Sequence, residues 1–290
     1  MVYLFIFSII PMFGILLAFK DYAITDGVMG IFTSPFSGLK HFREFFGEYK
    51  FWRLVRNTLA LSLLKLIFTF PVPIFFAIVV NELKNKVFKR FVQTASYLPY
   101  FISWVLVTGL FATFFSEYNG VVNEVLVRIG LIQKPIPLLV DPGLFYPLAV
   151  LSSIWKDTGW WTIIFLAAIA SLDAGLYEAA EVDGAGRLKR IRHITLPGLK
   201  STIVVVLILA LGNLLGGGLS GSNFEQSYLM GNPMNSDTSE IIQKYTFSVG
   251  LSQGRFAYAT AVGLIQSVIS LFLITVSNFS AKKLTGNGII

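Results

Sequence analysis

The chain has 290 residues, of which 54% are apolar and only 13% are charged. Soluble domains carry roughly a quarter charged residues, so this chain has too few charges to cover a soluble surface. Its apolar content also excludes a disordered chain. The absence of cysteine excludes disulfides, cysteine-ligated metal centres and thiol catalysis. The composition therefore predicts an integral membrane protein.

Six apolar segments are long enough to cross ~30 Å of hydrocarbon as helices, which takes about 20 residues each. None shows the alternating pattern of a membrane β-barrel. We predict an all-α membrane protein with one domain over residues 1–290 and six transmembrane helices. The predicted spans are about residues 2–19, 54–80, 97–115, 147–171, 199–219 and 257–279. Pro71 and Pro73 predict a kink in the second span, and the polar run 155–159 interrupts the fourth.

The positions of Lys and Arg predict the orientation, because cytoplasmic loops are enriched in these residues. Segments 81–96 and 172–198 hold four each, and Lys282 and Lys283 follow the last span. The longer loops 116–146 and 220–256 hold two each, whereas loop 20–53 departs from the trend with five. Most of this evidence places both termini in the cytoplasm. The net charge of +7 is then explained by the loops, and no nucleic-acid partner is expected.

Segment 172–198 predicts two short helices at the cytoplasmic membrane surface. Its acidic residues come first and its basic residues last, which suits a helix dipole. Gly184 and Gly186 permit a sharp turn between the helices, and Pro197 predicts a break where the next span begins. One apolar stripe is expected from three residues at three-residue spacing: Leu188, Ile191 and Ile194. Such a helix is suited to docking in a groove of a partner.

The same segment resembles the signature loop of permease subunits in bacterial binding-protein-dependent ABC importers. The matching positions form an ungapped pattern over twenty residues: Glu178, Ala179, Ala180, Gly184, Ile194, Leu196 and Pro197. In that family the loop supplies the coupling helix, which sits in a cleft of the ATP-hydrolysing subunit. The sugar branch often has aromatic residues where Leu188 and Ile191 stand, so the packing in that cleft is expected to differ in detail.

Two further stretches, residues 90–104 and 224–233, are similar to carbohydrate-importer permeases of the polysaccharide branch, which includes alginate importers. The resemblance implies a non-catalytic inner-membrane subunit that binds no cofactor itself. Its implied partners are a second permease, two ATPase subunits that bind ATP and Mg²⁺, an extracytoplasmic solute-binding protein, membrane lipid and a saccharide substrate.

Polar residues inside the spans are candidates for the substrate path, because ionisable groups are costly within a membrane. Counted at 1.5 Å per residue, Lys65 and Lys156 lie ~16 Å and ~14 Å below the outer face. Gln266 and Asn213 are predicted at similar depths in their own spans. The predicted path comprises Lys65, Thr69, Trp155, Lys156, Asp157, Asn213 and Gln266. For Lys156 and Asp157, an interhelical ion pair that fixes the bundle is an equally good interpretation.

The two lysines favour an acidic saccharide such as alginate, and the tryptophans within the fourth span offer flat faces for a sugar ring. Thr58, Ser62, Lys65 and Thr69 recur on one helix face, as expected for a wetted cavity wall.

The glycine-rich run 214–221 lacks the Gly-Lys-Ser/Thr of a nucleotide-binding loop, and no metal site is expected from the isolated His41 and His193. The alternative function is an integral membrane enzyme acting on lipid-linked sugars through Asp157 or Asp173.

Overall fold

The computed structural model describes residues 2–285, and side chains within residues 3–283. This part of the chain is helical without a named strand, and one isolated antiparallel bridge joins Lys20 to Phe36. Three helices are long and apolar enough to cross a membrane alone: Phe51–Asn81, Arg187–Gly212 and Phe256–Lys283. Two bent helix pairs bring the number to five, and Phe5–Phe19 is a shorter apolar helix. The count of six spans stays a prediction.

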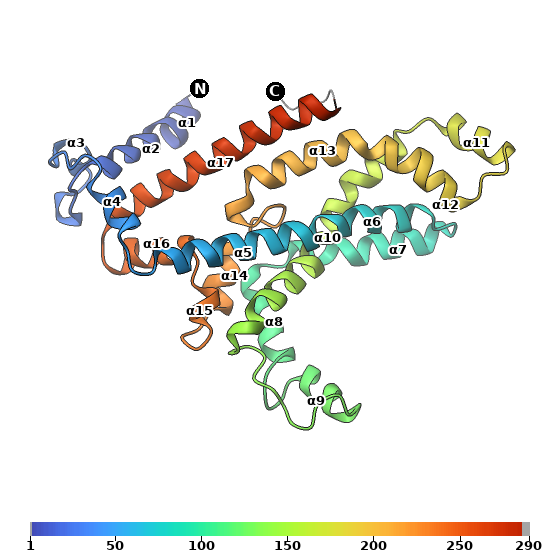
Figure 1. Cartoon of the computed structure of the whole chain (residues 1–290), viewed down its shortest axis with the longest axis horizontal. Coiled ribbons are helices and arrows are strands. Elements are labelled where there is room, and N and C mark those ends of the chain that lie inside the picture. Colours follow the sequence, from blue (N-terminus) through green and yellow to red (C-terminus); the bar gives the residue numbers. More distant parts are fainter. Residues whose placement is uncertain (1, 286–290) are drawn as a thin grey trace.

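The N-terminal helix lies along the last helix of the chain. It is one helical run whose winding changes from α to π and back, and then to 3₁₀: α1 (Val2–Leu4), η1 (Phe5–Ile9), α2 (Ile10–Met12) and η2 (Phe13–Phe19). Its final part, η2, packs against α17 (Phe256–Thr285). Three short helices follow: η3 (Ile24–Asp26), α3 (Gly30–Thr33) and α4 (Lys40–Phe46). Helix α1 and the last turns of α17 lie at the same edge of the molecule (Figure 1).

The second predicted span is interrupted at the predicted place. The helices α5 (Phe51–Thr69) and α6 (Pro71–Asn81) meet at Phe70, directly before Pro71. Pro71 has no N–H to donate, so the helical hydrogen-bond ladder is broken there. The two helices still form one long apolar rod (Figure 1).

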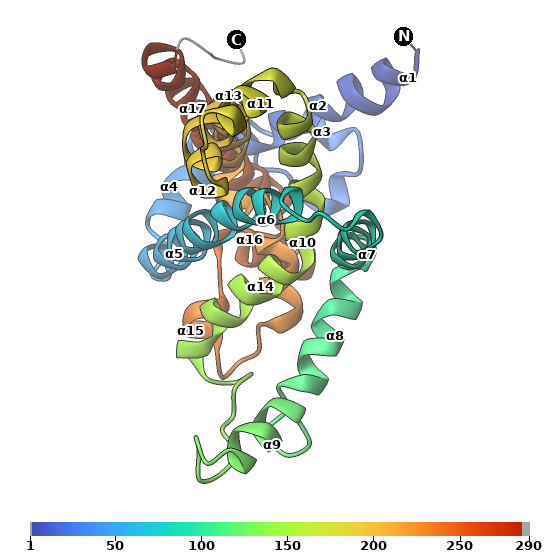
Figure 2. The ribbon, with the colours of Figure 1, turned by 90° about the vertical axis from the view of Figure 1, so that its right-hand side faces the viewer.

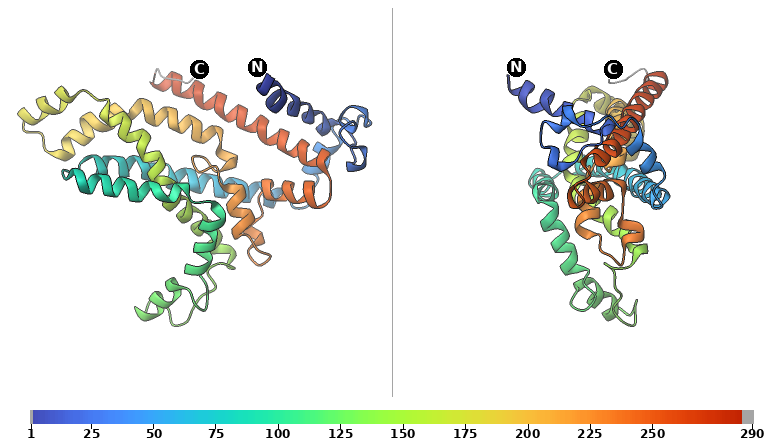
Figure 3. Two further views of the ribbon diagram at one scale, coloured as in Figure 1. Left: turned by 180° about the vertical axis from the view of Figure 1, so that it is seen from behind. Right: turned by 90° about the vertical axis from the view of Figure 1, so that its left-hand side faces the viewer.

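The third predicted span, 97–115, is wrong as a straight helix. Helix α7 (Lys86–Tyr97) continues into η4 (Leu98–Phe101), and then the chain turns by 103° into α8 (Trp104–Phe114). Pro99 lies in the first turn of η4, and Ile102 and Ser103 have extended backbones. The Ser103 hydroxyl then accepts a hydrogen bond from the Leu106 N–H and caps α8. Helix α8 therefore leaves the bundle sideways and leads to α9 (Val121–Arg128) (Figures 2 and 3).

The fourth span is continuous in spite of its polar run. After η5 (Pro142–Leu144), helix α10 (Phe145–Ala170) runs through residues 155–159 without a break. Several polar side chains of this helix are buried, including Lys156 and Asp157. Because these side chains find partners inside the bundle, the helix can carry them through its middle.

The fifth span begins twelve residues earlier than predicted. After α11 (Ala174–Val182), the chain forms α12 (Arg187–Arg190), the π-helix η6 (Ile191–Thr195) and α13 (Leu196–Gly212) as one helical run. Pro197 lies in the first turn of α13, where its missing N–H is tolerated. The expected break at Pro197 is therefore replaced by a wider helical turn just before it. The run ends at Gly212, seven residues before the predicted boundary, and η7 (Leu214–Gly216) follows.

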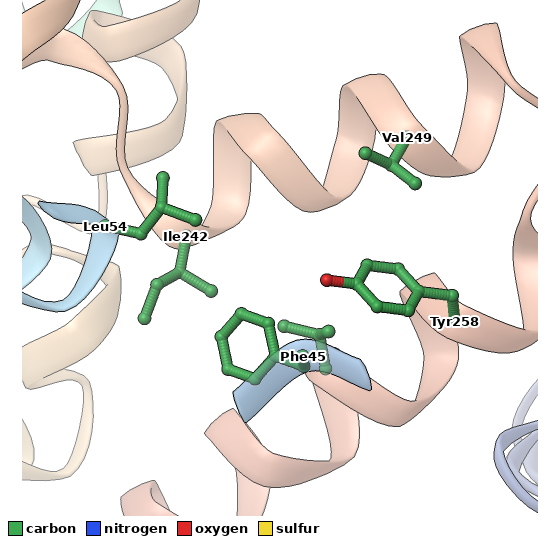
Figure 4. Packing of buried hydrophobic residues seen from close by; sticks show 6 residues of the cluster. Phe45, Leu54, Ile242, Val249 and Tyr258 are labelled. Atoms are coloured by element: carbon green, nitrogen blue, oxygen red, sulfur yellow. The ribbon is translucent and has the colours of Figure 1, made fainter. Parts of the chain in front are cut away.

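The remaining helices build the end of the bundle opposite α11 and α12. They are α14 (Asn223–Met230), α15 (Ser236–Ser239), α16 (Ile242–Ser252) and α17. Figure 4 shows a core in which Phe45, Leu54 and Ile242 lie close to Val249 and Tyr258. This core joins α4, α5, α16 and α17, so the outer parts of the chain form one packed unit.

A test of the fold concerns the crossing of α10 over α7. A Cβ atom at Gly159 would lie 2.0 Å from the Ser96 carbonyl oxygen, whereas one at Gly109, on exposed α8, meets nothing within 4 Å. Gly159→Ala should destabilise the protein by about 1–3 kcal/mol through overpacking. Gly109→Ala should be neutral or stabilising by up to ~1 kcal/mol. Thermal unfolding of the purified protein in detergent measures both, and equal shifts would contradict the crossing.

Candidate functional site

The glycine-rich segment folds back into the bundle as a short loop. Gly217, Gly218 and Gly221 have φ values of 110°, 62° and 60°, in the left-handed region that favours glycine. The Asn213 side-chain amide donates to the Gly218 carbonyl at 3.0 Å, and the Trp161 indole donates to the Leu219 carbonyl at 3.2 Å. The loop is therefore held against the end of α13 and the middle of α10.

This loop joins two buried charges of opposite sign. Lys65 on α5 is fully buried and donates to the Ser222 hydroxyl at 3.0 Å. The Ser220 hydroxyl donates to Asp157 Oδ2 on α10 at 2.6 Å, and the two serine hydroxyls are themselves hydrogen-bonded. Each hydroxyl has one proton, so Ser222 donates to Ser220. In this series of hydrogen bonds from Lys65 to Asp157, every donor therefore points toward the carboxylate. In such a series each hydrogen bond strengthens the next.

Amide side chains of α14 extend the network. Asn223 donates to the Ser62 hydroxyl at 2.9 Å. Gln226 donates to the hydroxyls of Ser152 and Ser153 at 2.8 and 3.0 Å. The sequence analysis missed these α14 and α10 residues. The spacing of Asn223 and Gln226, three residues apart in a helix, is the signal that places both amides on one face.

Lys156 faces a different part of the molecule. Its ammonium group donates to the Tyr100 carbonyl at 2.5 Å and lies 5.1 and 5.6 Å from the ring centres of Tyr100 and Trp104. These groups form the bend between η4 and α8, whose free carbonyls attract a cation. Lys156 and Asp157 therefore do not pair, as expected for adjacent residues that point ~100° apart on a helix.

The other predicted path residues are dispersed. The Thr69 hydroxyl donates to the Lys65 carbonyl at 2.7 Å, and Asn213 caps α13. Trp155 is 42% exposed and lies near Phe111, away from the loop. Gln266 lines a separate cavity of about 410 Å³ between α14, α16 and α17. Depth along the spans grouped Lys65, Lys156, Asn213 and Gln266, but depth does not determine which way a side chain points.

The coupling segment forms an exposed hairpin. Gly184 has a φ of 71° at the turn after α11, as predicted, whereas Gly186 has an ordinary φ of −66°. The Tyr177 hydroxyl lies 2.9 Å from the Thr195 hydroxyl and ties the two arms together. Among the motif residues, Glu178 and Ala179 are exposed and Ala180 is half-buried.

The predicted apolar stripe on this hairpin is only partly free. Leu188 is 79% exposed, but Ile191 and Ile194 are half-buried. Leu188, Ile191 and Leu196 border a groove of about 600 Å³ against α6. Part of the predicted stripe is therefore already covered within the chain, because the helix merges with α13 and turns part of this face toward α6. The freely exposed aliphatic side chains of the hairpin are Leu176, Val182 and Leu188.

The buried charges give a testable double-mutant cycle. Lys65→Met leaves Asp157 as an uncompensated buried charge and should destabilise the protein by about 3–5 kcal/mol. Asp157→Asn alone leaves Lys65 without its counter-charge and should destabilise the protein by a similar amount. The double variant removes both charges and should recover most of either loss. Thermal unfolding in detergent measures the cycle, with Lys200→Met on the exposed face of α13 as the control. Additive losses in the double variant would show that the two charges are independent.

Comparisons with known proteins agree with this architecture. Residues 69–286 match the family model of the binding-protein-dependent transport system inner membrane component. Protein LplB of Bacillus subtilis strain 168 is 44% identical over 289 residues, covering 100% of this chain and 88% of the relative. The polygalacturonan/rhamnogalacturonan transport system permease protein YteP of the same organism is 44% identical, covering 99% and 87%.

A solved structure matches nearly the whole chain. It is a bacterial alginate ABC transporter in complex with an alginate pentasaccharide-bound periplasmic protein. The TM-score is 0.88 at 38% identity, and the match covers 99% of this chain and 93% of the other. The chain therefore belongs to the binding-protein-dependent inner-membrane transport components, the multi-pass permeases of ABC importers, and its relatives lie in the carbohydrate branch.

Proposed function

We propose that this chain is a permease subunit that moves an oligosaccharide across the inner membrane when ATP is hydrolysed by separate partner subunits. The observation that carries the proposal is the exposed hairpin of α11 and α12, which presents the first part of the family motif, Glu178 to Gly184, outside the bundle. The rest of the motif, Ile194 to Pro197, lies in the helical run that continues into α13. In the proposed complex, the hairpin docks on one of two ATPase subunits, which bind ATP and Mg²⁺. A second permease and an extracytoplasmic solute-binding protein complete the assembly, and both termini of this chain lie in the cytoplasm.

The hairpin has the properties expected of a docking element. Leu176, Val182 and Leu188 are more than half exposed, and such aliphatic side chains gain free energy when a partner covers them. The basic residues of α12 lie beside them. Since the Tyr177–Thr195 contact ties the hairpin to the start of the long helix, a force on the hairpin acts directly on the bundle.

The substrate class is proposed from the relatives. YteP is described as a polygalacturonan/rhamnogalacturonan permease, and the solved transporter imports alginate. Both substrates are polymers that contain uronic acids, so we propose an oligosaccharide derived from an acidic polysaccharide. The proposed path passes the loop held by Lys65, Asp157 and Asn213. The other predicted path residues are dispersed over neighbouring helices: Thr69 on α5, Trp155 and Lys156 on α10, and Gln266 on α17.

The geometry gives no comparable support to a membrane enzyme acting on lipid-linked sugars. Such an enzyme would need clustered carboxylates. Asp157 is bonded to Ser220, whereas Asp173 caps α11 by accepting from the Gly175 N–H at 2.8 Å. Sixteen residues of mostly helical chain separate them, or ~24 Å at 1.5 Å per residue.

Coupling is tested at two neighbouring glycines. Gly184→Ala places a side chain in the left-handed region, at a cost of roughly 1–2 kcal/mol, and distorts the hairpin turn. Gly186→Ala introduces no such strain, because its φ is negative and no atom lies within 4 Å of its Cβ position. We expect Gly184→Ala to reduce saccharide-stimulated ATPase activity of the reconstituted complex, and Gly186→Ala to leave it unchanged. Equal activity of both variants would contradict the docking role of the hairpin.

A substitution at Lys156 tests whether this residue recognises the negative charge of the substrate. Both ammonium groups have partners within the chain, Ser222 for Lys65 and the Tyr100 carbonyl for Lys156. We therefore expect Lys156→Gln to reduce uptake of uronate and neutral oligosaccharides by the same factor. Uptake of radiolabelled oligosaccharides into proteoliposomes measures this. A selective loss of uronate uptake would instead assign Lys156 to the substrate carboxylate.

A further inference from the structure

The cavity beside Gln266 is built from one face of α16 together with parts of α14 and α17. On α16, Gln243, Phe247 and Gly250 follow helical spacing and line this cavity. The adjacent face carries Ile242 and Val249, which belong to the packed core in Figure 4. The core thus fixes α16 rigidly, and its neighbouring face stays available to a ligand.

The cavity combines aromatic walls with amide groups. Phe224 and Phe247 have ring centres 5.0 Å apart, and Tyr228 contacts both. Gln243 of α16 and Gln266 of α17 both line this cavity, together with Thr246. Among the described residues, Gln243 Oε1, Thr246 Oγ1 and Gln266 Nε2 are buried without a hydrogen-bond partner. Unpaired polar atoms are costly in a protein interior.

The size and charge of the cavity restrict what it can hold. Its volume of about 410 Å³ lies within the range of small-molecule sites, about 300–1,000 Å³. The lining runs from Phe256 to Gln266, ~15 Å along α17 at 1.5 Å per residue. The two helices approach closely where Gly250 of α16 meets Ala259 of α17, since a Cβ on Gly250 would lie 3.0 Å from the Ala259 Cβ. The described lining contains no charged side chain.

We propose that this cavity is a saccharide subsite that binds the uncharged parts of the sugar, its hydroxyl groups and the C–H face of its ring. Aromatic faces carry negative partial charge that attracts ring C–H groups. A glutamine amide both donates and accepts, which matches a hydroxyl group. The proposal deepens the proposed function and rests on it. Carboxylates of a uronate substrate would then be recognised by a different part of the transporter.

The first test uses the absence of native cysteine in this chain. Phe247→Cys, 39% exposed on the cavity wall, and Ser252→Cys, exposed outside the cavity, are each introduced alone. Both variants are reconstituted with the partner subunits and the binding protein, and maleimide labelling of this chain is followed during turnover. The probes are oligogalacturonate, an alginate pentasaccharide and a neutral arabino-oligosaccharide. We expect a transported saccharide to protect Cys at position 247 and not at position 252.

The outcomes separate the subsite from the function as a whole. Transport without protection at position 247 overturns the subsite and leaves the proposed function standing. A position 247 that is unreactive even without saccharide also overturns it, because another subunit or lipid then covers the cavity. If the complex with the unsubstituted chain transports none of the probes, both the subsite and the proposed substrate class fail.

A second test removes the amides one at a time. Gln266→Leu and Gln243→Leu should each lower the maximal transport rate roughly 3- to 10-fold, the effect of one lost hydrogen bond. The concentration of loaded binding protein at half-maximal rate should stay unchanged. Gln253→Leu, exposed beyond α16, is the matched control. Rates equal to that of the control, or a selective loss for uronates, would overturn the assignment.

Discussion

The arrangement of the bundle interior depends on one chain of hydrogen bonds, from Lys65 through Ser222 and Ser220 to Asp157. Two charges buried in a low-dielectric interior lose their hydration and must be satisfied by partners nearby. Here the intermediaries are hydroxyls on a loop, so satisfying the charges also fixes the loop between α5 and α10. The glycines that let the loop turn are consequently as necessary to the network as its polar atoms.

The network also changes the interpretation of the buried lysines. A lysine within a membrane span is a candidate for binding an anion. The charge of Lys65 is instead compensated by Asp157 through the two serine hydroxyls. The Lys156 ammonium group donates to the Tyr100 carbonyl at the bend before α8. The cavity by Gln266 has aromatic and amide groups in its lining and no charged side chain among the described residues. The described interior of this subunit is therefore better suited to hydroxyl groups than to carboxylates, although one relative is named for polygalacturonan/rhamnogalacturonan and one solved structure for alginate.

Much of the architecture could be predicted from the sequence, because apolar length and glycine placement act locally. The apolar segments became helices, and Gly184 occupies the left-handed turn where the motif placed it. The 103° bend was missed, since it depends on the extended backbone of Ile102 and Ser103, which no hydropathy pattern reports. The residues of the buried polar network were predicted only in part. Lys65 and Asp157 were both predicted for the path, but their link through the serines of the loop was not. The direction in which a side chain points depends on packing, which places Lys156 and Gln266 elsewhere.

The unbroken run from Arg187 to Gly212 has a mechanical consequence. Its 26 residues form a rod of ~39 Å at 1.5 Å per residue. One end, at Arg187, lies within the exposed hairpin, and the other adjoins the glycine loop. A tilt of about 5° about the Arg187 end would displace the loop end by ~3 Å, roughly the length of one hydrogen bond. The loop at that end contains the serines between Lys65 and Asp157, so one rigid helix links the exposed hairpin to the buried hydrogen bonds.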